Sequence, residues 1–291
     1  MDEQTSRIIY AEHNSPDLGA WRMAFMTPTQ SLAPYVVRFN AYCESDTGFV
    51  RRRETPSGLA TLVFNLGDEL RIEHPAGTLT AYRAGGAFYS GLSSAYAVSE
   101  TGGAQEGAQV MLTPLGARAL VGFPLEEIGD RLIDPVDLFG AAARETIARL
   151  QEANSPNRRL AILEQAMASR LAGMEPPLPR DLAFAARRLR ASCGRIGVAA
   201  LASEIGCSRK HLSVRFKREF GMAPKLFARV LRFDRALREL RGASAVDWAQ
   251  LADACGYADQ AHLTRDFAAF AGSPPAAFLR RGLPDSGGFT D

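Results

Sequence analysis

Cysteine and histidine are scarce in this chain of 291 residues. The cysteines stand alone, without a C-x-x-C pair, so their spacing indicates neither a zinc site nor a disulfide framework. His13 and His74 have no second histidine or carboxylate at metal-ligand spacing, and we assign them no metal. We expect the cysteines to be small buried side chains, with a redox sensor as the open alternative. They are Cys43, Cys193, Cys207 and Cys255.

Long apolar runs are absent as well. No segment reaches the roughly 18 apolar residues that cross a bilayer. The N-terminal segment MDEQTSRIIYAEH is acidic and lacks the basic start and apolar stretch of a signal peptide. No G-x-S-x-G, P-loop or H-E-x-x-H motif occurs. We therefore expect a cytoplasmic protein that is not an enzyme, with no catalytic residues, no metal, no cofactor and no membrane contact.

Lysine is rare, and its distribution along the chain is uneven. The three lysines, Lys210, Lys217 and Lys225, lie within 16 residues of one another. Residues 180–283 hold 19 basic and 9 acidic residues, a net charge of +10, whereas the remainder holds 15 and 23, a net charge of −8. This asymmetry indicates a basic part that binds a polyanion and an acidic part with another task. Charge alone does not separate DNA from RNA or a membrane surface.

The first third of the chain has the composition of β structure. Residues 29–113 are rich in Gly, Thr, Val and aromatic residues and are punctuated by Pro and Gly. The stretch 62–72, with Gly67-Asp68 at its centre, predicts a hairpin. Further strands are expected at 79–82, 87–89 and 109–113. Because no long helix separates the strands, a sandwich or barrel is favoured over a parallel sheet. The run Arg51-Arg52-Arg53 is either an anion-attracting patch or a solvated loop.

After Pro114 the apolar spacing becomes helical. Helices are expected at 115–121, 141–153 and 158–172. The last of these has a stripe that fits either a homodimer through paired helices or packing against the β domain. The stripe consists of Leu160, Leu163, Met167 and Leu171. The proline-rich segment 173–179 stops any helix and is expected to be a linker.

Two segments of the basic half repeat one pattern. Each has a small alanine where two helices must approach closely, a glycine four residues later that suits a left-handed turn, and a leucine that fills the angle between the helices. These residues are Ala202, Gly206 and Leu212 in the first copy and Ala252, Gly256 and Leu263 in the second. Downstream Phe, Gly, Pro and Phe also match, at an offset of 50 residues before the turn and 51 after it. Both copies are therefore helix-turn-helix cores, and the second has a turn one residue longer.

The stretch from about 181 to 282 resembles the DNA-binding domain of the AraC family, which has seven helices and two helix-turn-helix units joined by a long helix. The most specific match is GYADQAHLTRDF at 256–267, followed by GSPP at 272–275 and FLR at 278–280. The resemblance implies a sequence-specific transcription regulator that reads two successive major-groove segments of double-stranded DNA with the second helix of each unit. Asp266 and Ala268-Ala269 depart from the family pattern, and we expect them to weaken phosphate contact by the second unit.

The resemblance also assigns residues to the DNA. The base-facing positions are Lys210, Ser213 and Val214 in the first unit and Gln260, Ala261, His262, Thr264 and Arg265 in the second. Arginine and lysine suit guanine, glutamine suits adenine, and the Val214 or Thr264 methyl groups suit thymine. The candidates for DNA phosphates are Arg209, Arg215, Lys217 and Arg218. A row of arginines on the joining helix fits a solvated or salt-bridged face at least as well as phosphate binding. The row consists of Arg229, Arg232, Arg235 and Arg238.

The N-terminal half resembles a poorly characterised domain of some AraC-type factors. The similar pieces are LAPYV at 32–36, LVFNLGD at 62–68 and LGA at 115–117. Such a domain implies a signal input, so an unknown small-molecule effector and RNA polymerase join promoter DNA as expected partners. A set of aromatic side chains either lines a ligand pocket or forms plain core. The set consists of Phe39, Tyr42, Phe64, Tyr82, Phe88 and Tyr89.

Two other classes of protein can carry such a DNA-binding domain. DNA-repair methyltransferases with an AraC-like domain need a zinc-binding cysteine cluster and a reactive cysteine after proline, and this chain has neither. An architectural protein that binds DNA and senses nothing is the other alternative. Ligand-dependent stability of the N-terminal half separates that alternative from a sensor.

The expected fold class is α+β. Residues 1–175 are predicted to form a sensor or regulatory domain, a β sandwich or barrel to about residue 113 and helical beyond it. A linker at 176–180 precedes an all-α domain at 181–283 with two helix-turn-helix motifs joined by a long helix. Residues 284–291 are predicted to be a tail. We expect each domain to have a core of its own.

Overall fold

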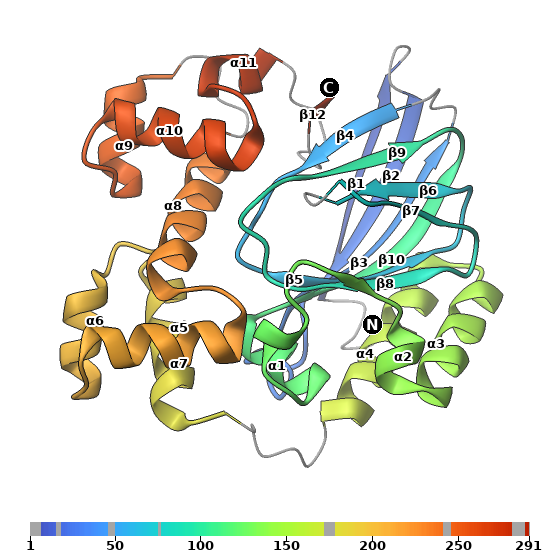
Figure 1. Cartoon of the computed structure of the whole chain (residues 1–291). Coiled ribbons are helices and arrows are strands. Elements are labelled where there is room, and N and C mark those ends of the chain that lie inside the picture. The colour runs from blue at the N-terminus through green and yellow to red at the C-terminus, as the bar shows by residue number, and fades with distance from the viewer. Residues whose placement is uncertain are drawn as a thin grey trace.

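The computed structural model describes residues 7–15, 19–45, 50–74, 77–171, 178–240, 246–280 and 289–290. In this part of the chain a β sandwich with flanking helices lies beside an all-helical C-terminal half (Figure 1). The fold class is α+β, as the sequence predicts. The expected linker at 176–180 and tail at 284–291 lie partly outside the described residues. Of the linker, Leu178 onward is described, and of the tail only the pair 289–290.

Two antiparallel sheets form the sandwich, and they do not close into a barrel. The larger sheet runs in the order β1 (Ile8–Ser15), β2 (Gly19–Met26), β3 (Val36–Ser45), β10 (Gln105–Leu112), β5 (Ala60–Asn65), β8 (Ala87–Ser90) and β11 (Leu132–Ile133). The smaller sheet runs in the order β12 (Phe289–Thr290), β4 (Val50–Glu54), β9 (Ala97–Thr101), β6 (Leu70–Glu73) and β7 (Leu79–Tyr82). The pair 289–290 thus returns from the far end of the chain to the edge of the smaller sheet (Figure 1).

Two expectations for the β region are wrong. The β structure begins well before residue 29, because β1 and β2 pair along their full length. The hairpin at 62–72 does not form either, because β5 pairs with β10 and β8 whereas β6 pairs with β7 and β9 in the other sheet. Gly67 allows this crossing, since a Cβ there would lie 2.4 Å from the backbone nitrogen of Glu106. The side-chain amide of Asn65 donates to the carbonyls of Asp68 and Tyr82, each at 2.8 Å, and holds the crossing in place.

The N-terminal half also contains helices among its described residues. They are α1 (Pro114–Val121), the 3-10 turn η2 (Leu125–Glu127), α2 (Pro135–Phe139), α3 (Ala141–Glu152) and α4 (Pro156–Leu171). α4 packs on β3 and β10, and its stripe of Leu160, Leu163, Met167 and Leu171 is buried there. Of the two explanations for the stripe, packing against the β domain is confirmed. Among the candidate pocket aromatics, Phe39, Phe64 and Tyr89 are at most 3% exposed and belong to the core.

The C-terminal half consists of seven helices in the described residues. They are α5 (Arg180–Ala191), α6 (Val198–Ile205), α7 (Arg209–Phe220), α8 (Pro224–Leu240), α9 (Trp248–Cys255), α10 (Gln260–Ala271) and α11 (Pro275–Arg280). This half contains two helical clusters, and phenylalanine side chains lie at the centre of each. Phe216 packs on Phe227 near the start of α8, and Phe233 packs edge-on against Phe267 at 5.0 Å between ring centroids. α8 therefore packs in both helical clusters and joins them.

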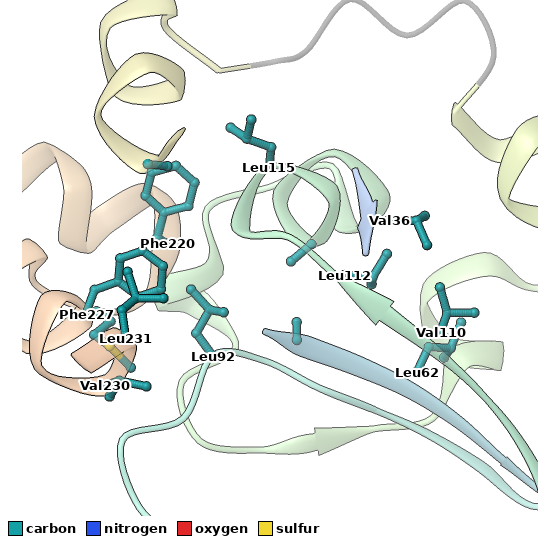
Figure 2. Close-up of a cluster of buried hydrophobic side chains, with 14 of the residues drawn as sticks. Val36, Leu62, Leu92, Val110, Leu112, Leu115, Phe220, Phe227, Val230 and Leu231 are labelled. Carbon is teal, nitrogen blue, oxygen red and sulfur yellow. The ribbon is translucent and has the colours of Figure 1, made fainter. Parts of the chain in front are cut away.

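The two halves do not have separate cores. Buried residues of both form one continuous apolar cluster. Figure 2 shows its meeting point, where Leu92 and Leu115 of the N-terminal half lie beside Phe220, Phe227 and Leu231. Burial of large apolar side chains stabilises by about 1.5–3 kcal/mol each, so a contact of this kind resists separation. The N-terminal half is thus packed firmly against the helices around α7 and the start of α8.

Candidate DNA interface

Each helix-turn-helix unit is shaped by an alanine and a glycine. In the first unit, α6 and α7, Ala202 is 2% exposed and Gly206 ends α6 with φ +77°. In the second unit, α9 and α10, Ala252 is 1% exposed and Gly256 ends α9 with φ +79°. A side chain at either glycine would be strained, because L-residues resist the left-handed region. The geometry confirms the two predicted helix-turn-helix cores.

The second helix of each unit begins at a side-chain cap. Ser208 Oγ accepts a hydrogen bond from the backbone N–H of His211 at 3.2 Å. Asp259 Oδ1 accepts one from the N–H of His262 at 2.7 Å. Such caps satisfy backbone donors that the first turn leaves unpaired and hold the helix start in a defined orientation. The caps lie two and three residues after the turn glycines Gly206 and Gly256, so the longer second turn is confirmed.

The predicted base-facing residues lie on accessible parts of α7 and α10. Lys210 and Val214 are exposed, and Val214 has 63% of its surface open to solvent, which is unusual for a large apolar side chain. Ser213 is half-buried. On α10, Gln260, Ala261 and Arg265 are exposed, whereas His262 and Thr264 are half-buried. The His262 ring meets Tyr257 edge-on at 5.1 Å, which fixes its direction.

The predicted phosphate-binding residues of the first unit are largely engaged within the chain. Arg215 makes two bonds to the carboxylate of Asp181, at 2.5 and 3.0 Å, and these hold the pKa of Asp181 below its usual value. Lys217 Nζ lies 3.1 Å from Glu126 of η2. Arg218 lies 3.7 Å from Glu219. Arg209 is exposed at the start of α7. Phosphate binding by three of these four residues therefore competes with an internal carboxylate.

The second unit has its acidic residue inside rather than at the surface. Asp266 is 1% exposed and accepts hydrogen bonds from Arg229 of α8, at 2.6 Å from Nη2 and 3.1 Å from Nε. The Asp266 carboxylate is therefore paired with Arg229 inside the domain and not presented at the surface, and its effect on phosphate contact stays a prediction. The Arg265 side chain bends back to the carbonyl of Ala261 in its own helix at 3.3 Å. That weak local contact leaves the guanidinium on the surface.

The arginines of α8 are salt-bridged or hydrogen-bonded. Besides the pair with Asp266, Arg232 donates to the carbonyl of Gly194 at 2.7 Å. Arg235 and Arg238 pair along the helix with Glu239 and Asp234. The salt-bridged explanation for this row is confirmed. α8 is a structural support between the units.

The N-terminal half contacts both units, and the sequence reasoning missed both contacts. Arg118 of α1 donates to Glu219 of α7 at 2.8 Å, with side chains only 7% and 11% exposed. Arg53 of β4 donates to the carbonyls of Ala271 and Gly272 at the end of α10, each at 3.3 Å. The solvated-loop explanation for Arg51-Arg52-Arg53 is wrong, because these residues form a strand. The three consecutive arginines in an otherwise acidic domain were the sequence feature that could have indicated the contact of Arg53.

The geometry of the two helix-turn-helix units defines a class of protein. Two angled helix pairs with accessible second helices, joined by one long helix in a basic half, define a double helix-turn-helix protein of the DNA-binding type. Residues 201–281 match a helix-turn-helix domain family, and residues 24–134 match a domain of unknown function, DUF6597. No curated protein is similar enough in sequence to match the chain.

Solved structures give weaker likenesses. ToxT from Vibrio cholerae is 12% identical with a TM-score of 0.48, over 83% of this chain and 97% of that chain. ToxT with a bound unsaturated fatty acid is 9% identical with a TM-score of 0.46, over 83% and 94%. A predicted oxalate decarboxylase from Thermotoga maritima is 15% identical with a TM-score of 0.28, over 39% of this chain and 99% of that chain.

The domain matches agree with the duplicated unit. The chain carries an AraC-type helix-turn-helix domain behind a DUF6597 domain, and it is a DNA-binding transcription regulator. Among the described residues, no helix is both long and apolar enough to cross a membrane.

Proposed function

We propose that the chain reads two successive major-groove segments of one DNA duplex, with α7 and α10 as the readers. The observation that carries this proposal is that the base-facing set is accessible on both helices while one helix, α8, holds both units. Val214 is the most telling member, because a large apolar side chain exposed on a polar helix suits a thymine methyl group. An α-helix fits the major groove, and readers about 34 Å apart meet the same side of the duplex.

The proposal is tested by separating base reading from phosphate binding. We expect Arg265→Ala to cost about 1–3 kcal/mol on the selected DNA site and to relax selectivity at one base. Lys217→Ala should weaken all sequences alike and reduce the salt slope, because a phosphate contact carries no sequence information. Binding titrations on the selected duplex and on a scrambled duplex measure both. Equal losses on the two duplexes for Arg265→Ala would remove it from the base-reading set.

We infer that the N-terminal half supplies a small-molecule input at a cleft against α5. The cleft has a volume of about 490 Å³, within the range of about 300–1,000 Å³ typical of small-molecule sites. One wall is apolar, from Pro28, Ala33 and Val36, and the other carries Arg187 and Arg190 of α5. Apolar residues and two arginines in one cleft suit a small carboxylate with an aliphatic part. A ligand there touches both halves of the chain.

The input is tested with the full chain and a series of aliphatic carboxylates of increasing length. We expect a rise in melting temperature that the matched alcohols do not produce, since binding to the folded state alone stabilises it. Arg190→Ala should abolish the rise. Arg180→Ala is the matched control, because Arg180 lies at the exposed start of the same helix and is not among the residues that line the cleft. An equal rise with the alcohols would contradict recognition of the carboxylate.

A further inference from the structure

The end of α10 is held from outside its own domain. Arg53 Nη1 lies 3.3 Å from the carbonyl oxygens of both Ala271 and Gly272. The guanidinium of the same arginine stacks over the ring of Tyr96, 4.9 Å from its centroid. At the end of α7, by contrast, the N–H of Gly221 donates to the carbonyl of Lys217 at 2.7 Å. The last carbonyls of α10 thus receive donors from a strand of the β sandwich.

The fit around Gly272 shows that this contact is close. Gly272 has φ +68°, and a Cβ there would lie 2.6 Å from Arg53 Nη1 and 2.7 Å from Cε1 of Tyr96. A side chain at Gly272 would be strained at this φ and would have to displace the end of the Arg53 side chain or the Tyr96 ring. A cation at a helix C-terminus interacts favourably with the helix dipole, and a guanidinium stacked on an aromatic ring is oriented by it. Tyr96 thus stacks on the same guanidinium that contacts the end of α10.

The first unit is held at the equivalent place. Gly221 ends α7 as Gly272 ends α10, and a Cβ on Gly221 would lie 3.4 Å from the carbonyl oxygen of Leu125 in η2. The N-terminal half therefore touches the C-terminal ends of both reading helices. One contact includes the buried pair of Arg118 and Glu219, and the other is polar and small. Together they add a second support to the one that α8 gives.

We propose that Arg53, oriented by Tyr96, is a positioning residue that fixes the angle of α10 relative to α7 and so sets the spacing between the two DNA segments that the chain accepts. The inference rests on the proposed function, in which both helices read DNA. Its role differs from that of a phosphate contact, because Arg53 acts on the helix end and not on the DNA. Loss of Arg53 should leave each reader's base preference intact and change only how strictly the two segments are spaced.

The first test is selection from double-stranded DNA with a randomised central region, using the full chain and its variants. The wild type should enrich two sequence blocks at one spacing. Arg53→Ala should enrich the same blocks over several spacings, with a fall of about tenfold in preference for the original one, the size expected for losing one guanidinium contact at a helix end. Tyr96→Ala should act in the same direction, whereas Tyr96→Phe, which keeps the ring, should behave like the wild type.

The matched control is Arg51→Ala. Arg51 lies on the same strand face as Arg53 but pairs with Glu73 and Glu100 of the sandwich, at 2.8 and 3.1 Å. This variant should keep the single spacing. Selection of a single wild-type spacing by Arg53→Ala would overturn the proposal. So would a broad distribution for Arg51→Ala, because general loosening of the strand would then explain the effect.

A second measurement needs no DNA. Spin labels carried by non-natural amino acids at Ser203 and Ala269, both exposed, report the distance between the two units in the full chain. The distribution should be narrow in the wild type and Arg51→Ala and broad in Arg53→Ala. An unchanged narrow distribution in Arg53→Ala would overturn the positioning role. If the wild type enriches no two-block DNA, the proposed function and the spacing claim fail together, while the label distances still decide whether Arg53 holds α10.

Discussion

The two helix-turn-helix units have the same internal design and different surroundings. In both, a left-handed glycine ends the first helix and a side-chain cap begins the second. The first unit is joined to the N-terminal half by apolar packing around Phe220 and by the buried pair of Arg118 and Glu219. The second unit meets that half through Arg53 and Tyr96, and its own charge pair, Arg229 with Asp266, is internal. The first unit is thus fixed to the N-terminal half by a buried contact, and the second is held by a smaller polar contact.

The two units also differ in how their basic residues are paired. The basic residues of the first unit suit phosphate binding, yet Arg215 and Lys217 are held by carboxylates, Asp181 and Glu126. The second unit has fewer charges, and its Arg265 remains at the surface. The first unit therefore has a buried contact with the N-terminal half, whereas the contact of the second unit through Arg53 is polar and small. Substitutions that remove one contact at a time should affect the two units differently.

The largest effect is expected at the anchor of the first unit. Glu219→Ala leaves Arg118 buried without its carboxylate, and breaking a buried pair in this way costs about 3–5 kcal/mol. The free energy of unfolding from urea denaturation, followed by tryptophan fluorescence, measures the loss. Glu204→Ala is the control, because Glu204 pairs with Arg188 at the surface, where water screens the pair and its loss should change the free energy of unfolding little. Equal losses for the two variants would show that the Arg118 pair does not anchor the unit.

A smaller loss is expected inside the second unit. Asp266→Asn keeps the shape of the buried side chain but removes the charge that Arg229 binds, which should cost about 1.5–3 kcal/mol. The cost stays below that of Glu219→Ala because Arg229 is 34% exposed and can turn toward water. The matched control is Asp253→Asn on the exposed face of α9. Urea denaturation should show little change for the control, and a loss larger than that of Glu219→Ala would reverse the ranking of the two units.

The sequence predicts the units better than the sandwich because their signals are local. A helix-turn-helix needs a small residue, a glycine and a leucine within a few turns of chain, and all lie within twelve or thirteen residues in both copies. The sandwich depends on which sheet each strand joins. The stretch 62–72 has the alternation of a hairpin, but the close approach of Gly67 to β10 sends its second arm to the other sheet. That approach joins segments about 40 residues apart.

The candidate site is predictable to a similar extent. The resemblance to the AraC-type domain implies that Val214 and Arg265 face the DNA, and both side chains are exposed. The position of Asp266 could not be predicted in this way. Its side chain points inward and binds Arg229 of α8, which is 37 residues away in the sequence. The contact of Arg53 with α10 could not be predicted from the sequence either. Three arginines in a row indicate that charge is present, but not that one of them ends at a helix of the other domain.

The smallest effect concerns the charge competition in the first unit. Arg215 lowers the pKa of Asp181, so their pair contributes stability above the unfolded pKa of Asp181, about 3.9, and that contribution is lost as the pH falls through the lower folded value. The side chains are 31% and 30% exposed, so Asp181→Asn should cost below about 1 kcal/mol at neutral pH, and that cost should vanish in acid. Urea denaturation at neutral and at acidic pH measures this cost in the free energy of unfolding.

The same substitution should strengthen DNA binding. Without its carboxylate, Arg215 is available to a phosphate, and each phosphate neutralised steepens the dependence of log K on log salt by about 0.9. Asp181→Asn should therefore bind selected and scrambled duplexes more tightly at low salt, with a steeper slope. The double variant Asp181→Asn with Arg215→Ala is the control, because it removes the same acidic charge. If the double variant gains as much as the single one, the gain comes from the lost negative charge and Arg215 is not a phosphate ligand held in reserve.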